Sequence, residues 1–327
     1  MPLSAAYRCD AGMLALIALC PELSGCDFRQ ALYLDTETTG LGGTGVVAFL
    51  VGLGWFDGAG QWVSQQLLLR QLSEEVPLLE CVREHVTRAS ALVTYNGKAF
   101  DWPTLTTRCV MNRLPVLPER PHFDLLHAAR RIHRPRLGAS RLITLENEVL
   151  GFVRGDDIAG SEVPGRYAHF QRTGDQEALR AVVEHNAWDL ASMGALVGLY
   201  GEPMTVLHRD DLAALARTLR RAGATALAES AAEAAVQRGA GTPALRVRAE
   251  LAKARGDRAR ALADFEALSR DVNDPTVRLE LAKLYEHFVK QPLVALETAL
   301  AGTGEPPEAA ERRLARLLRK SERRKLG

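Results

Sequence analysis

Short apolar runs in the first two hundred residues predict the strands of a sheet. Leu32–Glu37 is rich in strand-forming residues and ends in charged side chains. Val46–Phe56 and Gln61–Arg70 flank the tetrapeptide Asp-Gly-Ala-Gly, which is typical of a hairpin turn. Two shorter strands are expected within Ala91–Gly97 and Pro121–Leu126. The first strands therefore form an antiparallel hairpin.

Helical patterns alternate with the later strands. We expect an N-terminal helical extension over residues 1–29 and helices over Glu74–Arg88, Asp101–Leu114, Leu142–Leu150 and Gln176–Leu199. Pro103 is tolerated in the first turn of its helix. Gly151–Tyr167 is rich in glycine and charge and is predicted to be a loop. This order predicts an α/β fold, in which helices flank a mixed sheet.

The pattern changes near Leu207, where the chain becomes rich in Ala, Leu and Arg and shows no strand signal. Segments beginning at Leu215, Leu251 and Leu281 are weakly similar, and Gly223 aligns with Gly256 at an offset of 33 residues. A period near 34 with paired helices is typical of tetratricopeptide repeats. The alternative is a helical bundle without repeats.

Composition places the chain among ordinary globular proteins. It has 327 residues, of which 47% are hydrophobic and 25% charged, and this length allows about two domains. We expect the N-terminal extension at 1–29, the α/β domain at 30–202 and the helical domain at 203–327. The net charge of +1 neither favours nor excludes a nucleic-acid partner.

Cysteine usage and hydropathy indicate a cytoplasmic protein with no membrane partner. The five cysteines are odd in number and lack the close spacing of a zinc or redox site, which favours free thiols. The apolar run Met13–Cys20 is too short to span a bilayer. Asp10 precedes this run and argues against an export signal.

Asp35 and Glu37 are the first candidates for chemistry. Two residues apart on a strand, they project from the same face. Burying two like charges costs free energy. A divalent cation bound to the carboxylate oxygens would offset that cost. Alone, the pair is better explained as a strand end whose carboxylates face solvent or cap a helix.

Two further motifs change this interpretation. Asp101 follows a second predicted strand, after Asn96, and opens a helix. His185 and Asp189 are four residues apart, on one face of another helix, although this pair could also be a surface contact.

Together these motifs resemble the DEDD exonucleases, the DnaQ-like branch of the ribonuclease-H-like superfamily. The resemblance covers residues 30–200 and rests on the order, element type and spacing of the motifs. Ser161–Asp175 and the tetratricopeptide-like tail also resemble the bacterial YprB-type subgroup, the tail more loosely. One departure concerns the third motif, where His185 occupies the spacing of the family's tyrosine version.

The resemblance implies a metal-dependent 3′→5′ exonuclease that acts on single-stranded DNA or RNA with a free 3′ end and releases 5′-mononucleotides. Two divalent cations, Mg²⁺ or Mn²⁺, would be held by Asp35, Glu37, Asp101 and Asp189. Asp35 would bridge both cations, Glu37 and Asp189 would hold the one that carries the attacking water, and Asp101 would act on the leaving-group side. His185 would be the general base.

Candidate nucleic-acid contacts are Thr36, Thr38 and Asn96 near the site and a basic cluster of Arg130, Arg131, Arg134 and Arg136, although this cluster could equally be a solvated face. The last sixteen residues are also basic. They either form a helix that contacts nucleic acid or an acidic partner, or they are a frayed, solvated tail. Structural roles are predicted for Asp124 and Trp188. Asp156 and Asp157 are expected to be solvated.

Two other functions stay open at this point. The chain could be a weak or inactive nuclease whose repeats serve as a scaffold for a protein partner. It could also be a structure-specific endonuclease on the same fold. No motif distinguishes DNA from RNA, because that choice depends on contacts with the 2′ position of the sugar.

Overall fold

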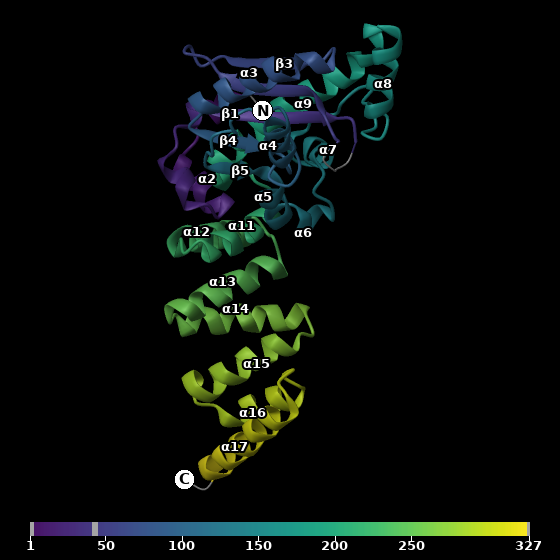
Figure 1. Cartoon of the computed structure of the whole chain (residues 1–327). Coiled ribbons are helices and arrows are strands. Elements are labelled where there is room, and N and C mark those ends of the chain that lie inside the picture. The colour runs from purple at the N-terminus through teal and green to yellow at the C-terminus, as the bar shows by residue number, and fades with distance from the viewer. Residues whose placement is uncertain (1–2, 41–44, 326–327) are drawn as a thin grey trace. The chain divides into compact units, whose positions relative to one another are not determined.

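The computed structural model describes residues 3–40 and 45–325. The chain divides into two compact units, Met1–Leu207 and His208–Gly327 (Figure 1). The first unit contains the sheet, and the second is entirely helical in its described residues. An α/β fold followed by an all-α region is therefore confirmed.

A five-stranded mixed sheet forms the centre of the first unit. Its strands are β1 (Ala31–Thr38), β2 (Ala48–Phe56), β3 (Trp62–Leu68), β4 (Ala91–Thr94) and β5 (His122–Asp124), in the spatial order β3-β2-β1-β4-β5. The first three strands are antiparallel, as the hairpin signal predicted, while β4 and β5 run parallel to β1. The carboxyl ends of β1, β4 and β5 consequently lie at the same edge of the sheet.

Helices pack against both faces of this sheet. The helices of the first unit are α1 (Ser4–Tyr7), α2 (Ala11–Ala18), α3 (Glu75–Arg88), α4 (Asp101–Met111), α5 (Leu125–Ile132), α6 (Arg134–Leu137), α7 (Leu142–Leu145), α8 (Val163–Thr173), α9 (Arg180–Gly201) and α10 (Pro203–Val206). Single turns join them: η1 (Pro21–Gly25), η2 (Phe28–Gln30), η3 (Leu72–Glu74), the π-helical η4 (Glu146–Leu150) and η5 (Gln176–Leu179).

Helix α8 corrects the prediction of a loop over Gly151–Tyr167, which was wrong from Val163 onward. Val163, Tyr167 and Phe170 are buried and spaced i, i+4, i+7, so they form one helical face against the core. The Tyr167 ring stacks on Phe49 of β2 at 4.0 Å between centroids. Pro164 is tolerated because it lies in the first turn.

Helix α9 carries a stripe of small residues where the N-terminal segment packs closely. A Cβ atom at Gly194 would lie 2.7 Å from the Leu3 side chain, and one at Gly201 would lie 2.6 Å from that of Cys9. Gly198 between them meets Ala5 at 2.9 Å. The absence of side chains on this face therefore lets residues 3–9 lie directly against the helix.

The helical unit consists of consecutive helices: α11 (Arg209–Arg221), α12 (Thr225–Gln237), α13 (Thr242–Arg255), α14 (Arg258–Asp271), α15 (Pro275–Leu284), the π-helical turn η6 (Tyr285–Val289), α16 (Pro292–Leu300) and α17 (Pro307–Lys325). Alternate helices begin 33 residues apart, at Arg209, Thr242 and Pro275. The basic tail forms α17 and buries Leu317, so a frayed tail is wrong for the described residues. Leu326 and Gly327 lie outside them.

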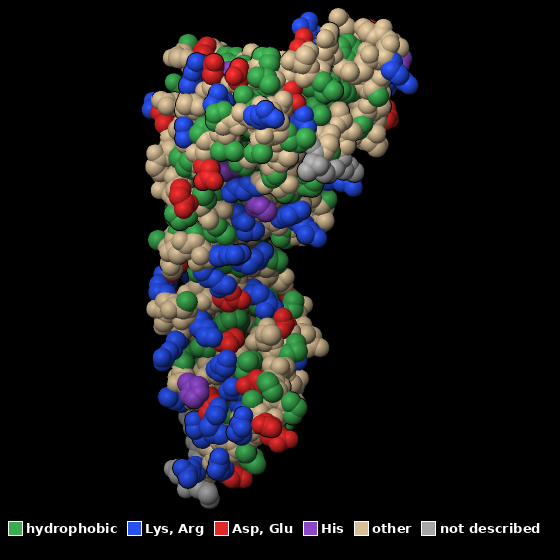
Figure 2. Space-filling model, in the orientation of Figure 1, with side chains coloured by type: hydrophobic (Ala, Val, Ile, Leu, Met, Phe, Trp, Pro, Cys, Tyr) green, Lys and Arg blue, Asp and Glu red, His purple; other side chains and the backbone are tan. Residues whose placement is uncertain are grey.

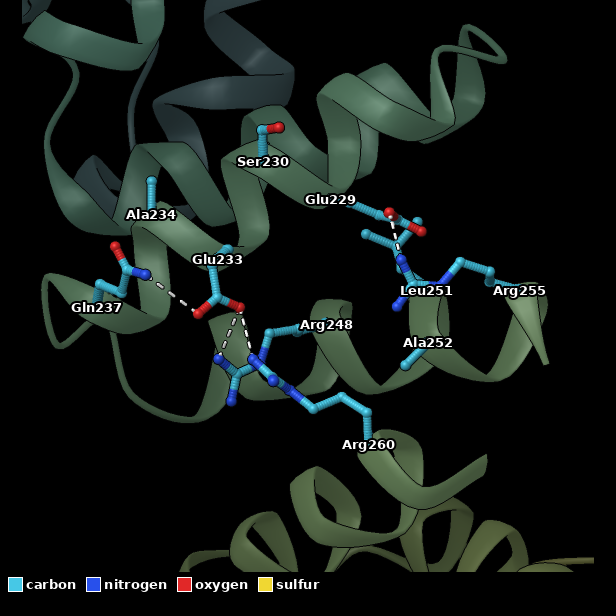
Figure 3. A pocket seen from close by; sticks show the side chains of 10 residues that line it. All are labelled: Glu229, Ser230, Glu233, Ala234, Gln237, Arg248, Leu251, Ala252, Arg255 and Arg260. Atoms are coloured by element: carbon cyan, nitrogen blue, oxygen red, sulfur yellow. Dashed lines mark hydrogen bonds and ion pairs between the residues drawn. The ribbon is translucent and has the colours of Figure 1, made fainter. Parts of the chain in front are cut away.

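A groove of about 410 Å³ runs between α12 and α13 of this unit (Figure 3). Its charges are paired: Glu233 accepts from Arg248 at 3.0 Å and from Arg260 at 2.7 Å, and Arg255 contacts Glu229 at 2.9 Å. On the face drawn in Figure 2, blue basic and red acidic side chains likewise alternate over these helices. Within residues 3–40 and 45–325, no helix has the length and apolar character needed to cross a membrane.

Candidate active site

Sheet topology brings the sequence motifs together. Asp35 and Glu37 lie at the carboxyl end of β1, where a β-bulge follows Glu37. Asp101 opens α4 just after β4, the parallel neighbour of β1. His185 and Asp189 lie on α9, which packs on β1. Three segments that are distant in the sequence thus meet at one edge of the sheet.

The four carboxylates are close enough to repel one another. Burial and the charges of Asp189, Asp101 and Glu37 raise the pKa of Asp35 well above its usual range. Burial raises the pKa of Glu37 to about 7, against the opposing charge of His185, and burial raises that of Asp101 to about 6. Burial therefore favours the protonated forms of these acids, and the charges of neighbouring acids add to this effect at Asp35 and Glu37.

Hydrogen bonds from the protein orient two of these carboxylates. The side-chain amide of Asn186 donates to Oδ2 of Asp35 at 2.8 Å, and Gln66 in turn donates to Oδ1 of Asn186 at 3.0 Å. The hydroxyl of Thr36 donates to Oδ1 of Asp101 at 2.5 Å. Asp35 is consequently held by a residue of α9, and Asp101 by a residue of β1.

His185 presents its two ring nitrogens to different surroundings. Nδ1 lies 2.6 Å from Oδ1 of Asp157, whereas Nε2 lies 3.7 Å from Oδ2 of Asp189 and 4.0 Å from Oε1 of Glu37. Burial lowers the pKa of His185, but the charges of Asp189, Asp157 and Glu37 outweigh it and raise the pKa overall. The spacing of four residues from Asp189 therefore brings Nε2 toward the acid cluster.

Arg154 connects the site to a buried acid behind it. Its guanidinium donates to both oxygens of Glu146, at 2.7 and 2.6 Å, and also to Asp157 and Asp189. The Arg154 side chain is 2% exposed and that of Glu146 is fully buried. The guanidinium also lies 5.7 Å from the centre of the Trp188 ring, so Trp188 is packed against this network.

Sequence reasoning missed Arg154, Asp157, Glu146 and Asn186. The prediction that Asp157 is solvated was wrong, since it is bound to His185 and Arg154, whereas its neighbour Asp156 is exposed. The only local signal was the charge pattern Arg-Gly-Asp-Asp in an otherwise flexible-looking segment. Asp157 lies 28 residues from its partner His185, and Asn186 lies 151 residues from its partner Asp35, so no spacing rule reports these contacts.

The remaining predicted residues fall into two groups. Near the site, the hydroxyl of Thr38 donates to the carbonyl of Gly40 at 2.7 Å, and Asn96 has a left-handed backbone with φ of 70°. The backbone N–H groups of Asn96, Lys98 and Leu126 all donate to Asp124, which agrees with a structural role for that residue.

The basic cluster lies on α5 and α6, where Figure 2 shows blue side chains on the surface. Arg130 and Arg134 are exposed, and Arg136 is half-buried. Arg131 is also half-buried and donates to the carbonyl of Ile17 at 2.6 Å. The cluster as a site for nucleic acid stays a prediction.

Gly52 offers a test of the packing behind Asp35. It pairs with Asp35 in the sheet, and a Cβ at this position would lie 2.1 Å from Oδ1 of Asn186. We expect Gly52→Ala to push Asn186 away from Asp35 and to lower the free energy of unfolding by about 1–3 kcal/mol. Urea denaturation measures the change. Gly58→Ala is the control, because no heavy atom lies within 4 Å of its added Cβ, and an equal loss in both variants would contradict the explanation.

The donor set at this edge is chemically suited to a hard divalent cation, since four carboxylates with raised pKa values face one another. In the described part of the chain, however, no group of three or more His, Cys, Asp or Glu side chains is arranged to hold a metal ion. Arg154 contacts Oδ1 of Asp189, one of the four acids. The four carboxylates are therefore suited to a divalent cation, and in this structure hydrogen-bond donors of the protein, such as Arg154, contact them.

Two known proteins are similar to parts of this chain. Over 179 residues, the chain is 41% identical to the uncharacterized protein YprB of Bacillus subtilis. The aligned region covers 54% of this chain and 42% of YprB. Among solved structures, the chain is similar to a family B DNA polymerase from Pyrobaculum calidifontis, with 15% identity, a TM-score of 0.42, and coverage of 64% of this chain and 28% of the polymerase. The chain thus spans less than half the length of either protein.

One protein-family model matches most of the first unit. The match covers residues 32–200, from the strand that carries Asp35 to the end of the helix that carries Asp189. This segment is more than half of the 327 residues. The chain therefore belongs to the RNase H superfamily.

Proposed function

We propose that this protein is a metal-dependent 3′→5′ exonuclease that hydrolyses phosphodiester bonds of single-stranded nucleic acid. Membership of the RNase H superfamily suggests a nuclease and a nucleic-acid substrate. The finer proposal rests on one observation: β1, α4 and α9 bring Glu37, Asp101 and Asp189 so close to Asp35 that burial and their charges raise its pKa, next to Nε2 of His185.

Two divalent cations, Mg²⁺ or Mn²⁺, would be held by these four carboxylates and would stabilise the negative charge that develops on the phosphate and the leaving oxygen. Two dipositive ions would balance four carboxylates and so remove the repulsion that, together with burial, raises the pKa of Asp35. Asp189 would then be shared with Arg154, which contacts one of its oxygens.

His185 would accept the proton of the attacking water, and Asn186 and Thr36 would hold two of the acids in place. Nε2 of His185 faces Glu37 and Asp189 without a hydrogen bond to either, so it is available to accept the proton of the attacking water. Asn186 and Thr36 hold Asp35 and Asp101 in place. The leaving 3′-oxygen takes its proton from solvent, and a 5′-mononucleotide is released.

A gel assay with end-labelled strands tests the proposal. Single- and double-stranded DNA and RNA are incubated with Mg²⁺ or Mn²⁺, and the products are resolved by length. We expect stepwise shortening from the 3′ end that stops in EDTA and in Asp189→Asn. Cutting of a circular strand would instead favour a structure-specific endonuclease. Absence of cutting, with retained divalent binding in calorimetry, would favour an inactive scaffold.

We further propose that the helical unit is tetratricopeptide-like and contributes to partner binding. Its helices recur every 33 residues, and residues 208–327 hold 23 Lys and Arg against 17 Asp and Glu, a net charge of +6. The chain as a whole carries +1, so the first unit carries −5. A polyanion would therefore be attracted to the helical unit more than to the surface of the catalytic unit. Binding that does not weaken as salt rises would contradict this assignment.

The raised pKa values predict an unusual pH dependence. Glu37 has an ordinary pKa of 4.5 and a pKa of about 7 in the folded protein, so between these values the folded state binds more protons than the unfolded state. The free energy of unfolding in EDTA should consequently fall as pH rises from about 5 to about 7, by up to about 3 kcal/mol from this group. His185, whose pKa is also raised, changes the stability in the same direction.

Thermal unfolding across this pH range measures the effect, and Glu37→Gln isolates the contribution of Glu37. We expect the slope to be smaller in Glu37→Gln, and to be abolished by saturating Mn²⁺, because a bound cation keeps the carboxylates deprotonated. Identical slopes for the two proteins in EDTA would show that Glu37 has an ordinary pKa.

A further inference from the structure

The two nitrogens of His185 cannot be interchanged in this site. Nδ1 has two polar neighbours, Oδ1 of Asp157 at 2.6 Å and Nη1 of Arg154 at 3.1 Å. Nε2 lies beyond hydrogen-bond distance of the two nearest acids of the cluster, Asp189 at 3.7 Å and Glu37 at 4.0 Å. The location of the ring proton therefore decides which nitrogen can accept a proton from substrate.

Only one placement of that proton satisfies the contacts of Nδ1. If Nδ1 carried no proton, it could accept from Arg154, but its lone pair would face a carboxylate oxygen at 2.6 Å. If Nδ1 is protonated, it donates to Asp157, and Nη1 of Arg154 still has an acceptor in the other oxygen of Asp157 at 3.2 Å. The second arrangement gives each donor an acceptor, and it leaves Nε2 as the base.

Asp157 is itself held in place from behind. The backbone N–H of Ile158 donates to its Oδ1 at 2.9 Å, and Arg154 contacts its Oδ2. Arg154 is anchored by two hydrogen bonds to the buried Glu146, which also accepts from the hydroxyl of Ser192 at 2.5 Å. The orientation of His185 is thus fixed by a chain of contacts that begins in the core at Glu146 and runs through Arg154 and Asp157; Arg154 also contacts Asp189 of the acid cluster.

We propose that Asp157 is a positioning residue: its carboxylate holds the Nδ1–H of His185 and so presents Nε2 to the water that attacks the phosphodiester. This inference rests on the proposed exonuclease function. It also explains how a histidine at the spacing of a tyrosine serves as the base, because Asp157 orients the ring from the side opposite the acids.

Two measurements on the full chain test the proposal. The first is ¹⁵N NMR of histidine-labelled protein in EDTA, at a pH where the ring is neutral, with His185→Gln used to assign the signal. We expect the Nδ1–H tautomer in the wild type and a loss of that preference in Asp157→Asn. An Nε2–H tautomer in the wild type would overturn the proposal. Because this readout needs no activity, it is decisive even if the chain does not cut nucleic acid.

The second measurement is steady-state kinetics with a 3′-labelled single strand. Asp157→Asn should lower kcat by about 10²–10⁴-fold and change KM by less than about threefold, by analogy with other orienting carboxylates. Asp157→Asn should have no further effect in a His185→Ala background. Asp156→Asn is the matched control, since that neighbour is exposed, and it should behave as the wild type. If Asp157→Asn lowers kcat by the same factor in the wild type and in the His185→Ala background, Asp157 does not act through His185. Inactivity of the wild type would refute the proposed function and leave the NMR result standing.

Discussion

Asparagine in place of Asp35 should abolish metal-dependent cleavage and, at the same time, make the metal-free protein more stable. Asp35 is surrounded by Asp189, Asp101 and Glu37, and burial with these charges raises its pKa well above the usual range. A neutral amide of the same shape removes that repulsion and still accepts the hydrogen bond from Asn186. Function and stability should therefore change in opposite directions, as is common when charges are held for catalysis.

The expected magnitudes are large enough to separate the two effects. Loss of a shared metal ligand should cost several kcal/mol of transition-state stabilisation, which is about 10³-fold or more in rate. The gain in the metal-free state should be on the order of 1–2 kcal/mol, or about 3–6 °C in Tm for a unit of this size. Thermal unfolding with EDTA and with Mn²⁺, together with the cleavage assay, measures both.

Asp156→Asn serves as the control, because it removes one negative charge from an exposed position outside the cluster. It should leave the rate, the Tm in EDTA and the rise in Tm with Mn²⁺ unchanged. A drop in the Tm of metal-free Asp35→Asn, or cleavage that persists in it, would show that Asp35 has no place in a cation site.

Replacement of Arg154 by methionine should strongly destabilise the first unit. It would leave the fully buried Glu146 without its guanidinium partner and release Asp157 and Asp189. Breaking a buried ion pair on one side typically costs about 3–5 kcal/mol, because the remaining charge stays desolvated. Urea denaturation of the variant measures the loss, and cleavage should fall with it.

A double variant distinguishes the buried charge from lost packing. Arg154→Met with Glu146→Gln removes both charges and keeps an acceptor for the hydroxyl of Ser192. It should recover much of the stability that the single variant loses, although not its activity, since Asp189 and Asp157 still lack their donor. If the single variant loses less than about 1 kcal/mol, Arg154 does not carry the role assigned to it.

Local patterns predicted the elements that carry the acids. The resemblance to the DEDD exonucleases grouped Asp35, Glu37, Asp101 and Asp189 into one predicted site. Apolar runs and turn residues placed the strands β1 to β5. These predictions succeed because strand and helix periodicity depend on near neighbours in the chain. Helix α8 was missed since its glycine and proline residues outweighed the spacing of Val163, Tyr167 and Phe170.

The groups that orient the acids could not be found in the same way. Arg154 and Glu146 are eight residues apart, but their pairing depends on the π-helical turn and on the side chain of Ser192 from α9. Asn186 reaches Asp35 because β2 has a glycine opposite it. Such contacts are set by tertiary packing, and a single sequence does not record them.

The close fit of residues 3–9 against α9 has a consequence for synthesis. The ribosome releases the N-terminal segment first, but its partners Gly194, Gly198 and Gly201 emerge only after about two hundred residues. Residues 3–9 therefore lack these packing partners while the sheet is synthesised, and their contact with α9 forms last. A nascent chain that stops short of Gly201 should consequently lack the support for the helix that bears His185 and Asp189. Cutting activity should then arise late in translation, as the helical repeats begin to leave the exit tunnel.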